Sequence, residues 1–98
     1  MSPFFYYNES MKRYYIIYQG IVQGVGFRGK AIACARKHSL TGYVRNCANG
    51  DVECEIQGEE VDAFVKETIA DDRFAKVFDY SLKELPVKED EKNFRVRF

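Results

Sequence analysis

The sequence predicts an α+β domain in which two helices cover one face of an antiparallel sheet. Two stretches, residues 27–38 and 59–70, repeat apolar residues at a spacing close to 3.6, which is typical of helices buried on one side. Segments rich in β-branched and aromatic residues lie before, between and after these stretches, as strands do. The 98 residues, 46% hydrophobic and 31% charged, have the size and composition of one globular domain.

The first strand and the first helix are joined by a glycine-rich loop. Residues 12–22, KRYYIIYQGIV, are expected to form a strand that ends near Gly20, because β-branched and aromatic residues dominate it. Residues 27–38, FRGKAIACARKH, are expected to form a helix. Gly29 inside this helix costs roughly 0.5–1 kcal/mol relative to alanine. The apolar side of the helix would consist of Phe27, Ala31, Cys34, Ala35 and His38.

The middle of the chain predicts a β-hairpin, with strands over residues 40–47 and 51–58. A two-residue Asn-Gly turn would direct Val44 away from the apolar residues of the second strand. A three-residue loop, with Gly50 in a left-handed bulge position, pairs Cys47 with Asp51 instead. We favour this register because it gathers the apolar residues on one face. That face would carry Val44, Asn46, Val52, Cys54 and Ile56.

The remaining elements complete a known arrangement. Residues 59–70 are expected to form the second helix, with acidic residues in the first turn, where the helix dipole favours them. A strand over residues 75–86, a solvated charged turn over 88–92 and a short closing strand over 94–98 follow. The order strand, helix, strand, strand, helix, strand predicts the split βαβ, or ferredoxin-like, plan.

Residues 1–11 are expected to form a mobile extension to a domain that covers residues 12–98. The first ten residues lack the basic and apolar segments of a signal peptide, and no run approaches the ~20 apolar residues of a membrane span. Fifteen basic and fifteen acidic residues give a net charge of zero, which argues against a nucleic-acid binder. We therefore expect a cytoplasmic monomer with neither a nucleic-acid nor a membrane partner.

The cysteines and the single histidine show no spacing typical of a zinc site, so we expect no metal and no cofactor. Cys34, Cys47 and Cys54 are interpreted as reduced thiols, which is usual in the cytoplasm. The hairpin nevertheless allows a disulfide between Cys47 and Cys54. His38 is interpreted as structural.

The loop GIVQGVGFRGKA partly matches two nucleotide-binding motifs. The spacing Gly24-x-Gly26-x-x-Gly29 is that of a dinucleotide-binding turn, but a short chain with a central hairpin cannot build the two βαβαβ halves of that fold. The spacing Gly24-x-x-x-x-Gly29-Lys30 is that of a P-loop, but Ala31 stands where a hydroxyl must hold Mg²⁺.

A third interpretation fits the loop better. Gly24 and Gly26 allow backbone N–H groups to turn inward around an anion at a helix N-terminus, and Arg28 adds a planar cation suited to phosphate oxygens. The alternative is a structural turn followed by a surface arginine. Either way, the loop requires glycine for its backbone conformation.

Asn46 favours the anion-binding interpretation. In the split βαβ plan the first and second strands are parallel, so their ends lie at the same edge of the sheet. In the favoured register Asn46 faces the helix side, where the helix that carries Arg28 begins. Its carboxamide can donate to and accept from a water beside a bound phosphate. Asn46 could instead simply begin a turn.

The segments GIVQGVGFR and LTGYVRNCANGDVECEIQG together resemble the acylphosphatase family, and the resemblance extends over residues 13–98. It implies metal-free hydrolysis of a small acyl phosphate, with inorganic phosphate as product and inhibitor. It implies that Arg28 binds the phosphate and that Asn46 positions the attacking water. Ser39 stands where many members have glycine. The implied phosphate-binding loop consists of Gln23, Gly24, Val25, Gly26, Phe27 and Arg28.

A binding module without turnover is the alternative. The family relationship extends to modules within larger proteins, so a ferredoxin-like domain that binds an anion or a partner is conceivable. Tyr14, Tyr15 and Tyr18 on the first strand suggest base stacking on RNA. The zero net charge argues against that use.

Overall fold

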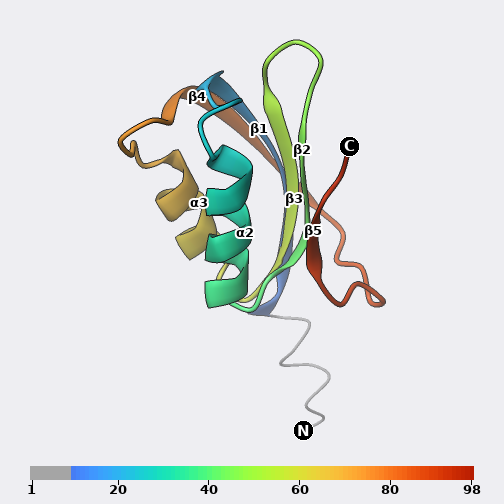
Figure 1. Cartoon of the computed structure of the whole chain (residues 1–98). Coiled ribbons are helices and arrows are strands. Elements are labelled where there is room, and N and C mark those ends of the chain that lie inside the picture. Colours follow the sequence, from blue (N-terminus) through green and yellow to red (C-terminus); the bar gives the residue numbers. More distant parts are fainter. Residues whose placement is uncertain (1–9) are drawn as a thin grey trace, which may run out of the picture.

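The computed structural model describes residues 10–98 and places them in two layers, a sheet and a pair of helices (Figure 1). The expectation of a mobile extension over residues 1–11 falls almost entirely outside the described residues. The predicted elements are all present, with ends that differ by one or two residues at most. In chain order they are β1 (Lys12–Ile21), α2 (Phe27–Lys37), β2 (Thr41–Asn46), β3 (Val52–Gly58), α3 (Val61–Ile69), β4 (Lys76–Leu85) and β5 (Phe94–Val96).

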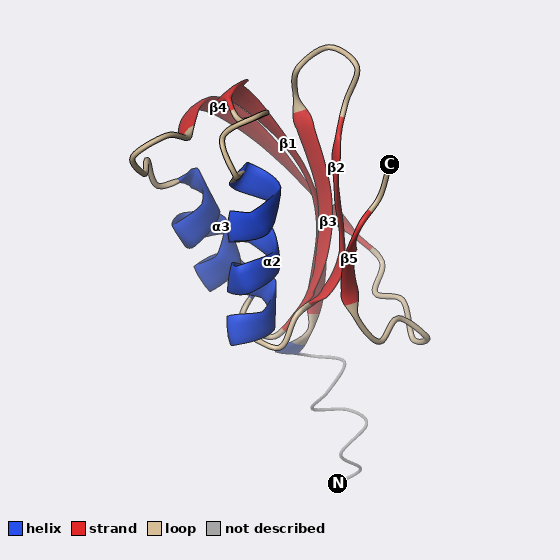
Figure 2. Ribbon diagram, viewed as in Figure 1, coloured by secondary structure: helices blue, strands red, loops and turns tan. Residues whose placement is uncertain are grey.

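The strand order β4-β1-β3-β2-β5 confirms the ferredoxin-like prediction. β1 pairs antiparallel with β3 and β4, β2 pairs antiparallel with β3, and both helices cover one face of the sheet (Figure 2). β5 departs from the predicted antiparallel sheet, because it pairs parallel with β2. β4 runs opposite to β2, so the chain reversal in residues 86–93 gives β5 the direction of β2. No helix within residues 10–98 is long and apolar enough to cross a membrane.

The core between the layers fixes the start of α2 beside the end of β1. Tyr14, Ile16 and Tyr18 alternate along β1 and are buried against the helices. The Tyr18 ring packs edge-to-face on Phe27, the first residue of α2, with 4.8 Å between ring centroids. The Tyr18 hydroxyl lies 2.7 Å from Thr68 Oγ1 in α3. These contacts hold the loop between β1 and α2 at one defined place.

The β2–β3 hairpin adopts the predicted three-residue loop. Asn46 lies opposite Val52, and the Cys47 N–H donates to the Asp51 carbonyl at 2.9 Å. Gly50 takes the left-handed conformation that the bulge requires, with φ 98°. Because its cross-strand partner Val52 is fully buried, Asn46 lies on the face of the sheet that the helices cover.

The register also excludes the disulfide that the hairpin seemed to allow. Cys54 lies opposite Val44 on the helix-facing side, whereas Cys47 is paired with Asp51 and points to the other side. All three cysteines are free thiols.

Ser39 ends α2 in a left-handed conformation, with φ 55°, and is the one non-glycine residue of the described chain with positive φ. The Leu40 N–H donates to the Ala35 carbonyl at 2.8 Å, as in a Schellman motif. We expect Ser39→Gly to raise the free energy of unfolding by about 1 kcal/mol, because glycine has no Cβ to strain this conformation. Urea unfolding measures the difference, and a variant no more stable than the parent contradicts this interpretation.

A buried arginine lies under the loop that follows β4. Arg13 is fully buried and donates to Glu55, to Gln57 and, through two nitrogens, to Glu91. The prediction of a solvated turn over residues 88–92 is therefore wrong for Glu91. Its carboxylate compensates the buried guanidinium and holds this loop against the outer face of the sheet.

The tyrosines of β1 do not form a stacking surface for RNA. Tyr14 and Tyr18 are buried between sheet and helices. Tyr15 lies on the outer face, but its hydroxyl donates to Glu53 at 2.7 Å, and a carboxylate beside the ring repels a phosphate backbone. The RNA interpretation is therefore not favoured.

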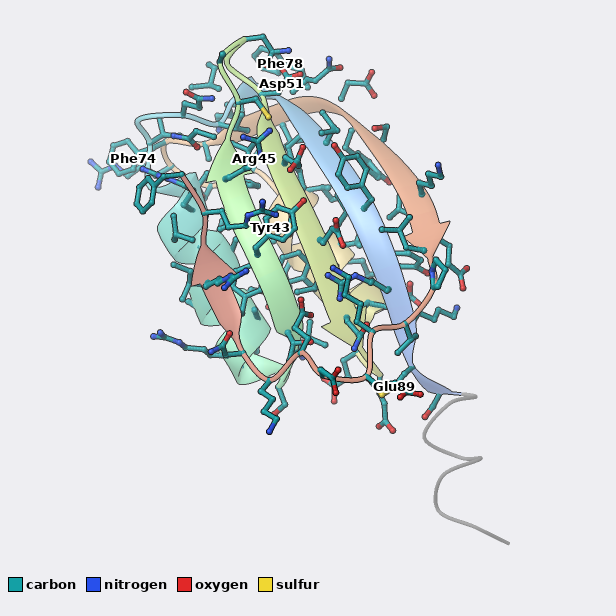
Figure 3. All side chains as sticks on the ribbon, turned by 90° about the vertical axis from the view of Figure 1, so that its right-hand side faces the viewer. Tyr43, Arg45, Asp51, Phe74, Phe78 and Glu89 are labelled. Carbon is teal, nitrogen blue, oxygen red and sulfur yellow. The ribbon has the colours of Figure 1, made fainter. Side chains whose placement is uncertain are left out.

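Glu53 is the centre of a hydrogen-bonded group on the outer face, where Tyr43 and Arg45 are visible in Figure 3. It accepts hydrogen bonds from Tyr15 at 2.7 Å and from Tyr43 and Arg45 at 2.8 Å. Partial burial opposes its ionisation, but the hydrogen bonds outweigh this and lower the pKa of Glu53 from 4.5 to about 2. A lowered pKa means that the ionised group stabilises the fold fully above pH 4.5. That stabilisation is lost as the pH falls towards about 2.

We expect Glu53→Gln to lower the free energy of unfolding at neutral pH by up to about 3.5 kcal/mol, because the pKa falls from 4.5 to about 2 and each unit of pKa shift corresponds to about 1.4 kcal/mol. The variant should also lose less stability than the parent on acidification from pH 4.5 to 2. Urea unfolding at several pH values measures both effects. Glu89→Gln, at an exposed position of the loop after β4, is the matched control and should behave like the parent. An equal acid dependence in parent and Glu53→Gln contradicts the assignment.

Candidate active site

The loop between β1 and α2 leaves the first turn of the helix open. Gly24 and Gly26 have φ values of 74° and 80°, and Gly26 directly precedes the helix. No side chain of residues 10–98 caps this end, and the first turn of the helix contains no acidic residue. The first N–H groups of a helix have no acceptor within it, so here they and the positive end of the helix dipole are available to an anion.

Arg28 lies in this open first turn and is half-buried. Among residues 10–98 its guanidinium makes no hydrogen bond or ion pair, and its Cζ lies 5.7 Å from the centre of the Phe98 ring. Arg13 and Arg45, in contrast, are paired with carboxylates. An unpaired planar cation at an uncapped helix N-terminus is well suited to bind phosphate oxygens.

Gln23 joins the loop to the hairpin. Its side-chain nitrogen donates to the backbone carbonyls of Cys47 and Asp51, at 2.8 Å each. From the sequence, Gln23 was expected only among the residues around the phosphate, and its contact with the hairpin was not predicted. The two bonds fix the end of β2, and with it Asn46, relative to the loop. A lone amide side chain in a glycine-rich loop was the available signal, but its partner lies more than twenty residues away.

Asn46 presents a polar atom that the surrounding protein leaves unsatisfied. Its Oδ1 is buried and accepts no hydrogen bond from the described residues. A buried polar atom without a partner is costly, so it indicates a ligand or an ordered water. Figure 1 shows the β1–α2 loop and the β2–β3 hairpin at the same end of the molecule, as the shared sheet edge predicted.

Arg28, Asn46 and part of the glycine-rich loop line one small pocket with a volume of about 160 Å³. Gln23 and Val25 do not line it. Phe27 lines it although the residue is almost fully buried. Gly29, which was not among the residues expected to bind the phosphate, belongs to the pocket wall. The lining residues are Val22, Gly24, Gly26, Phe27, Arg28, Gly29 and Asn46.

Comparison with known proteins gives one consistent result. The sequence model of the family "Acylphosphatase" matches residues 14–96. An acylphosphatase of Clostridium beijerinckii is 49% identical over 90 residues, which are 90% of this chain and 100% of that protein. The crystal structure of acylphosphatase from Bacillus subtilis has a TM-score of 0.83 and 36% identity, covering 89% of this chain and 99% of that one.

A second solved structure agrees with the first over nearly the whole length. The structure of an acylphosphatase from Coxiella burnetii has a TM-score of 0.85 and 30% identity, and covers 99% of this chain and 100% of that chain. The matched region contains the loop, the open helix end and the end of β2 that form the pocket. The chain therefore belongs to the acylphosphatase family.

Proposed function

We propose that the chain hydrolyses the carboxyl-phosphate bond of small acyl phosphates through a defined division of roles within the pocket. Arg28 and the backbone N–H groups of residues 23–28 hold the phosphoryl group, and Asn46 orients the water that attacks phosphorus. Acyl phosphate hydrolysis follows from family membership. The roles of the individual residues are our proposal.

One observation carries this assignment. The unbonded Asn46 Oδ1 and the unpaired Arg28 lie on the wall of the same pocket, beside an uncapped helix end. The guanidinium and the N–H groups can neutralise the charge of the phosphoryl oxygens. Asn46 Oδ1 can accept a hydrogen bond from a water and so direct a lone pair of the water oxygen towards phosphorus. Positioning and charge neutralisation are the main requirements of phosphoryl transfer.

The substrate supplies what the pocket lacks. The described residues that line the pocket include no histidine, aspartate or glutamate, so none of these side chains can act as a general base. A phosphoryl oxygen of the substrate can take the proton of the attacking water. The leaving group is a carboxylate, which departs as a stable anion and needs no proton from a general acid. Arg28 neutralises charge on the phosphoryl oxygens throughout.

Phosphate release from acetyl phosphate tests the proposal against a binding module without turnover. Continuous release that depends on Arg28 supports the enzyme, whereas tight binding of acetyl phosphate with no release favours the module. We further propose that inorganic phosphate competes with the substrate, because it fits the same groups. We also propose that the protein acts as a cytoplasmic monomer. Inhibition kinetics, sedimentation and cell fractionation test these points.

We expect activity to survive exhaustive chelation without added Mg²⁺. Ala31 stands where a P-loop has its metal-binding hydroxyl, and the pocket wall carries no carboxylate or imidazole. The measurement is kcat/KM before and after dialysis against EDTA. Activity that falls in EDTA and returns with a divalent ion would contradict the proposed mechanism.

A further inference from the structure

A cysteine, a histidine and a glutamate meet between the two helices, away from the phosphate pocket. Cys34 lies in the last turn of α2 and His38 is the residue that follows the helix, four positions later and close to Cys34 in space. Glu67 faces them from α3, which packs beside α2. One ligand atom of each, the Cys34 sulfur, a His38 ring nitrogen and a Glu67 carboxylate oxygen, all lie within 4.8 Å of one another.

The remaining polar atoms of this cluster have partners of their own. His38 Nδ1 lies 2.5 Å from a Glu60 carboxylate oxygen, and Glu67 Oε1 lies 2.8 Å from Lys37 Nζ. This leaves His38 Nε2 and Glu67 Oε2, 2.5 Å apart, facing each other beside Cys34. A histidine that ligates a metal usually gives its other ring N–H to a carboxylate, and Glu60 is placed to accept it.

We propose that Cys34 Sγ, His38 Nε2 and Glu67 Oε2 form a binding site for Zn²⁺. Thiolate, imidazole and carboxylate are the zinc ligands of proteins, and three of them leave the fourth tetrahedral position to a water. Cys34 and Glu67 also line a pocket of about 460 Å³, which gives that water space. The spacing rules applied to the sequence miss this site because Glu67 lies 29 residues beyond His38.

Metal binding has two requirements that the local structure can meet. Two ligands of a tetrahedral zinc lie about 3.3 Å apart, so the Glu67 carboxylate must withdraw slightly from His38. Its side chain is 38% exposed and its other partner, Lys37, is 65% exposed, so both side chains have room to shift. Burial raises the pKa of the Cys34 thiol to about 11, and hydrogen bonds to Glu60 and Glu67 raise the pKa of His38. The metal must therefore displace two protons, one from the thiol and one from between His38 Nε2 and Glu67 Oε2, and both pass to solvent.

The site is separate from the phosphate pocket. His38 lies ten residues beyond Arg28, or about 15 Å along α2. Zinc there would join α2 to α3 and stabilise the fold, because it binds only when both helices are in place. Turnover of acyl phosphate should not change.

The test is titration of the full chain with Zn²⁺, followed by thermal unfolding. At about one hundred times its Kd, Zn²⁺ is expected to raise Tm by at least about 10 °C. Co²⁺ should produce a thiolate-to-metal charge-transfer band together with the intense visible bands of tetrahedral coordination. His38 is the chain's one histidine, so its imidazole signals report Nε2 coordination without ambiguity.

Variants assign the effect to these ligands. Cys34→Ala should abolish the charge-transfer band of the Co²⁺ form. The Zn²⁺-induced rise in Tm is measured for each variant against the same variant without metal. Most of that rise should be lost in Cys34→Ala, His38→Ala and Glu67→Gln. Cys47→Ala and Asp71→Asn are matched controls, a thiol elsewhere and an acid on the rim of the same pocket, and should keep it. No Tm shift in the parent, or one that survives in Cys34→Ala and His38→Ala, would overturn the proposal.

Discussion

Replacing Arg28 with alanine is expected to lower kcat/KM by at least about 10²-fold and to weaken inhibition by inorganic phosphate in parallel. Both effects have one proposed cause, a contact of the guanidinium with the phosphoryl oxygens in the bound substrate and in the transition state. Arg28 has no ion pair with another described residue, so its removal leaves no buried carboxylate unpaired. The fold should therefore persist.

Arg28→Lys separates charge from geometry. A lysine keeps the positive charge but cannot make the paired contact of a planar guanidinium, so we expect it to restore little activity. Arg36→Ala, at an exposed position of the same helix, is the control for a general loss of positive charge and should keep nearly full activity. Steady-state kinetics with and without phosphate measures all three variants. Activity within about threefold of the parent in Arg28→Ala, against the 10²-fold loss expected of such a contact, would exclude Arg28 from the site.

Asn46→Ala is expected to reduce turnover by about 10²–10³-fold, as when one positioned polar group is lost. Inhibition by phosphate should change much less, because Asn46 is proposed to contact the water and not chiefly the phosphate. Asn46 Oδ1 accepts no hydrogen bond from residues 10–98, so its removal breaks no hydrogen bond within the described structure. Circular dichroism and a melting curve check that the variant folds. Asn49→Ala, at the exposed tip of the same hairpin, is the matched control.

Two ratios between Asn46→Ala and the parent, that of turnover and that of the phosphate inhibition constant, distinguish three roles of Asn46. A fall in turnover with little change in the phosphate inhibition constant supports a water-positioning residue. A parallel change of both, as in Arg28→Ala, makes Asn46 a phosphate ligand and contradicts the proposed role. If neither changes, Asn46 is only a turn residue, and its buried Oδ1 has no catalytic meaning.

The sequence was informative where local chemistry decides the structure. Glycines at Gly24, Gly26 and Gly50 indicated positive φ, and the need to bury apolar residues on one side chose the hairpin register. That register, with the parallel relation of β1 and β2, was sufficient to bring Asn46 to the pocket that contains Arg28. The left-handed conformation of Ser39 was expected only from the family resemblance, because many members have a glycine at this position.

The sequence was uninformative where a partner lies far along the chain. Arg13 and Glu91 are 78 residues apart, and no local pattern indicates that one is buried beneath the other. The Gln23 side chain bonds to backbone carbonyls, which every residue carries, so its partners leave no trace in the sequence. The direction of β5 is likewise set by how the loop after β4 reverses the chain, and a short alternating segment does not reveal it.

The position of attack is tested most directly by hydrolysis of acetyl phosphate in water enriched in the heavy oxygen isotope. Mass spectrometry of the products locates the oxygen that came from water. In the proposed mechanism Arg28 and the helix N–H groups hold the phosphoryl group and Asn46 directs water to phosphorus. The heavy atom should therefore appear in inorganic phosphate, and the acetate should remain unlabelled. Label in the acetate would show attack at the carbonyl carbon, and would contradict the roles proposed for both residues.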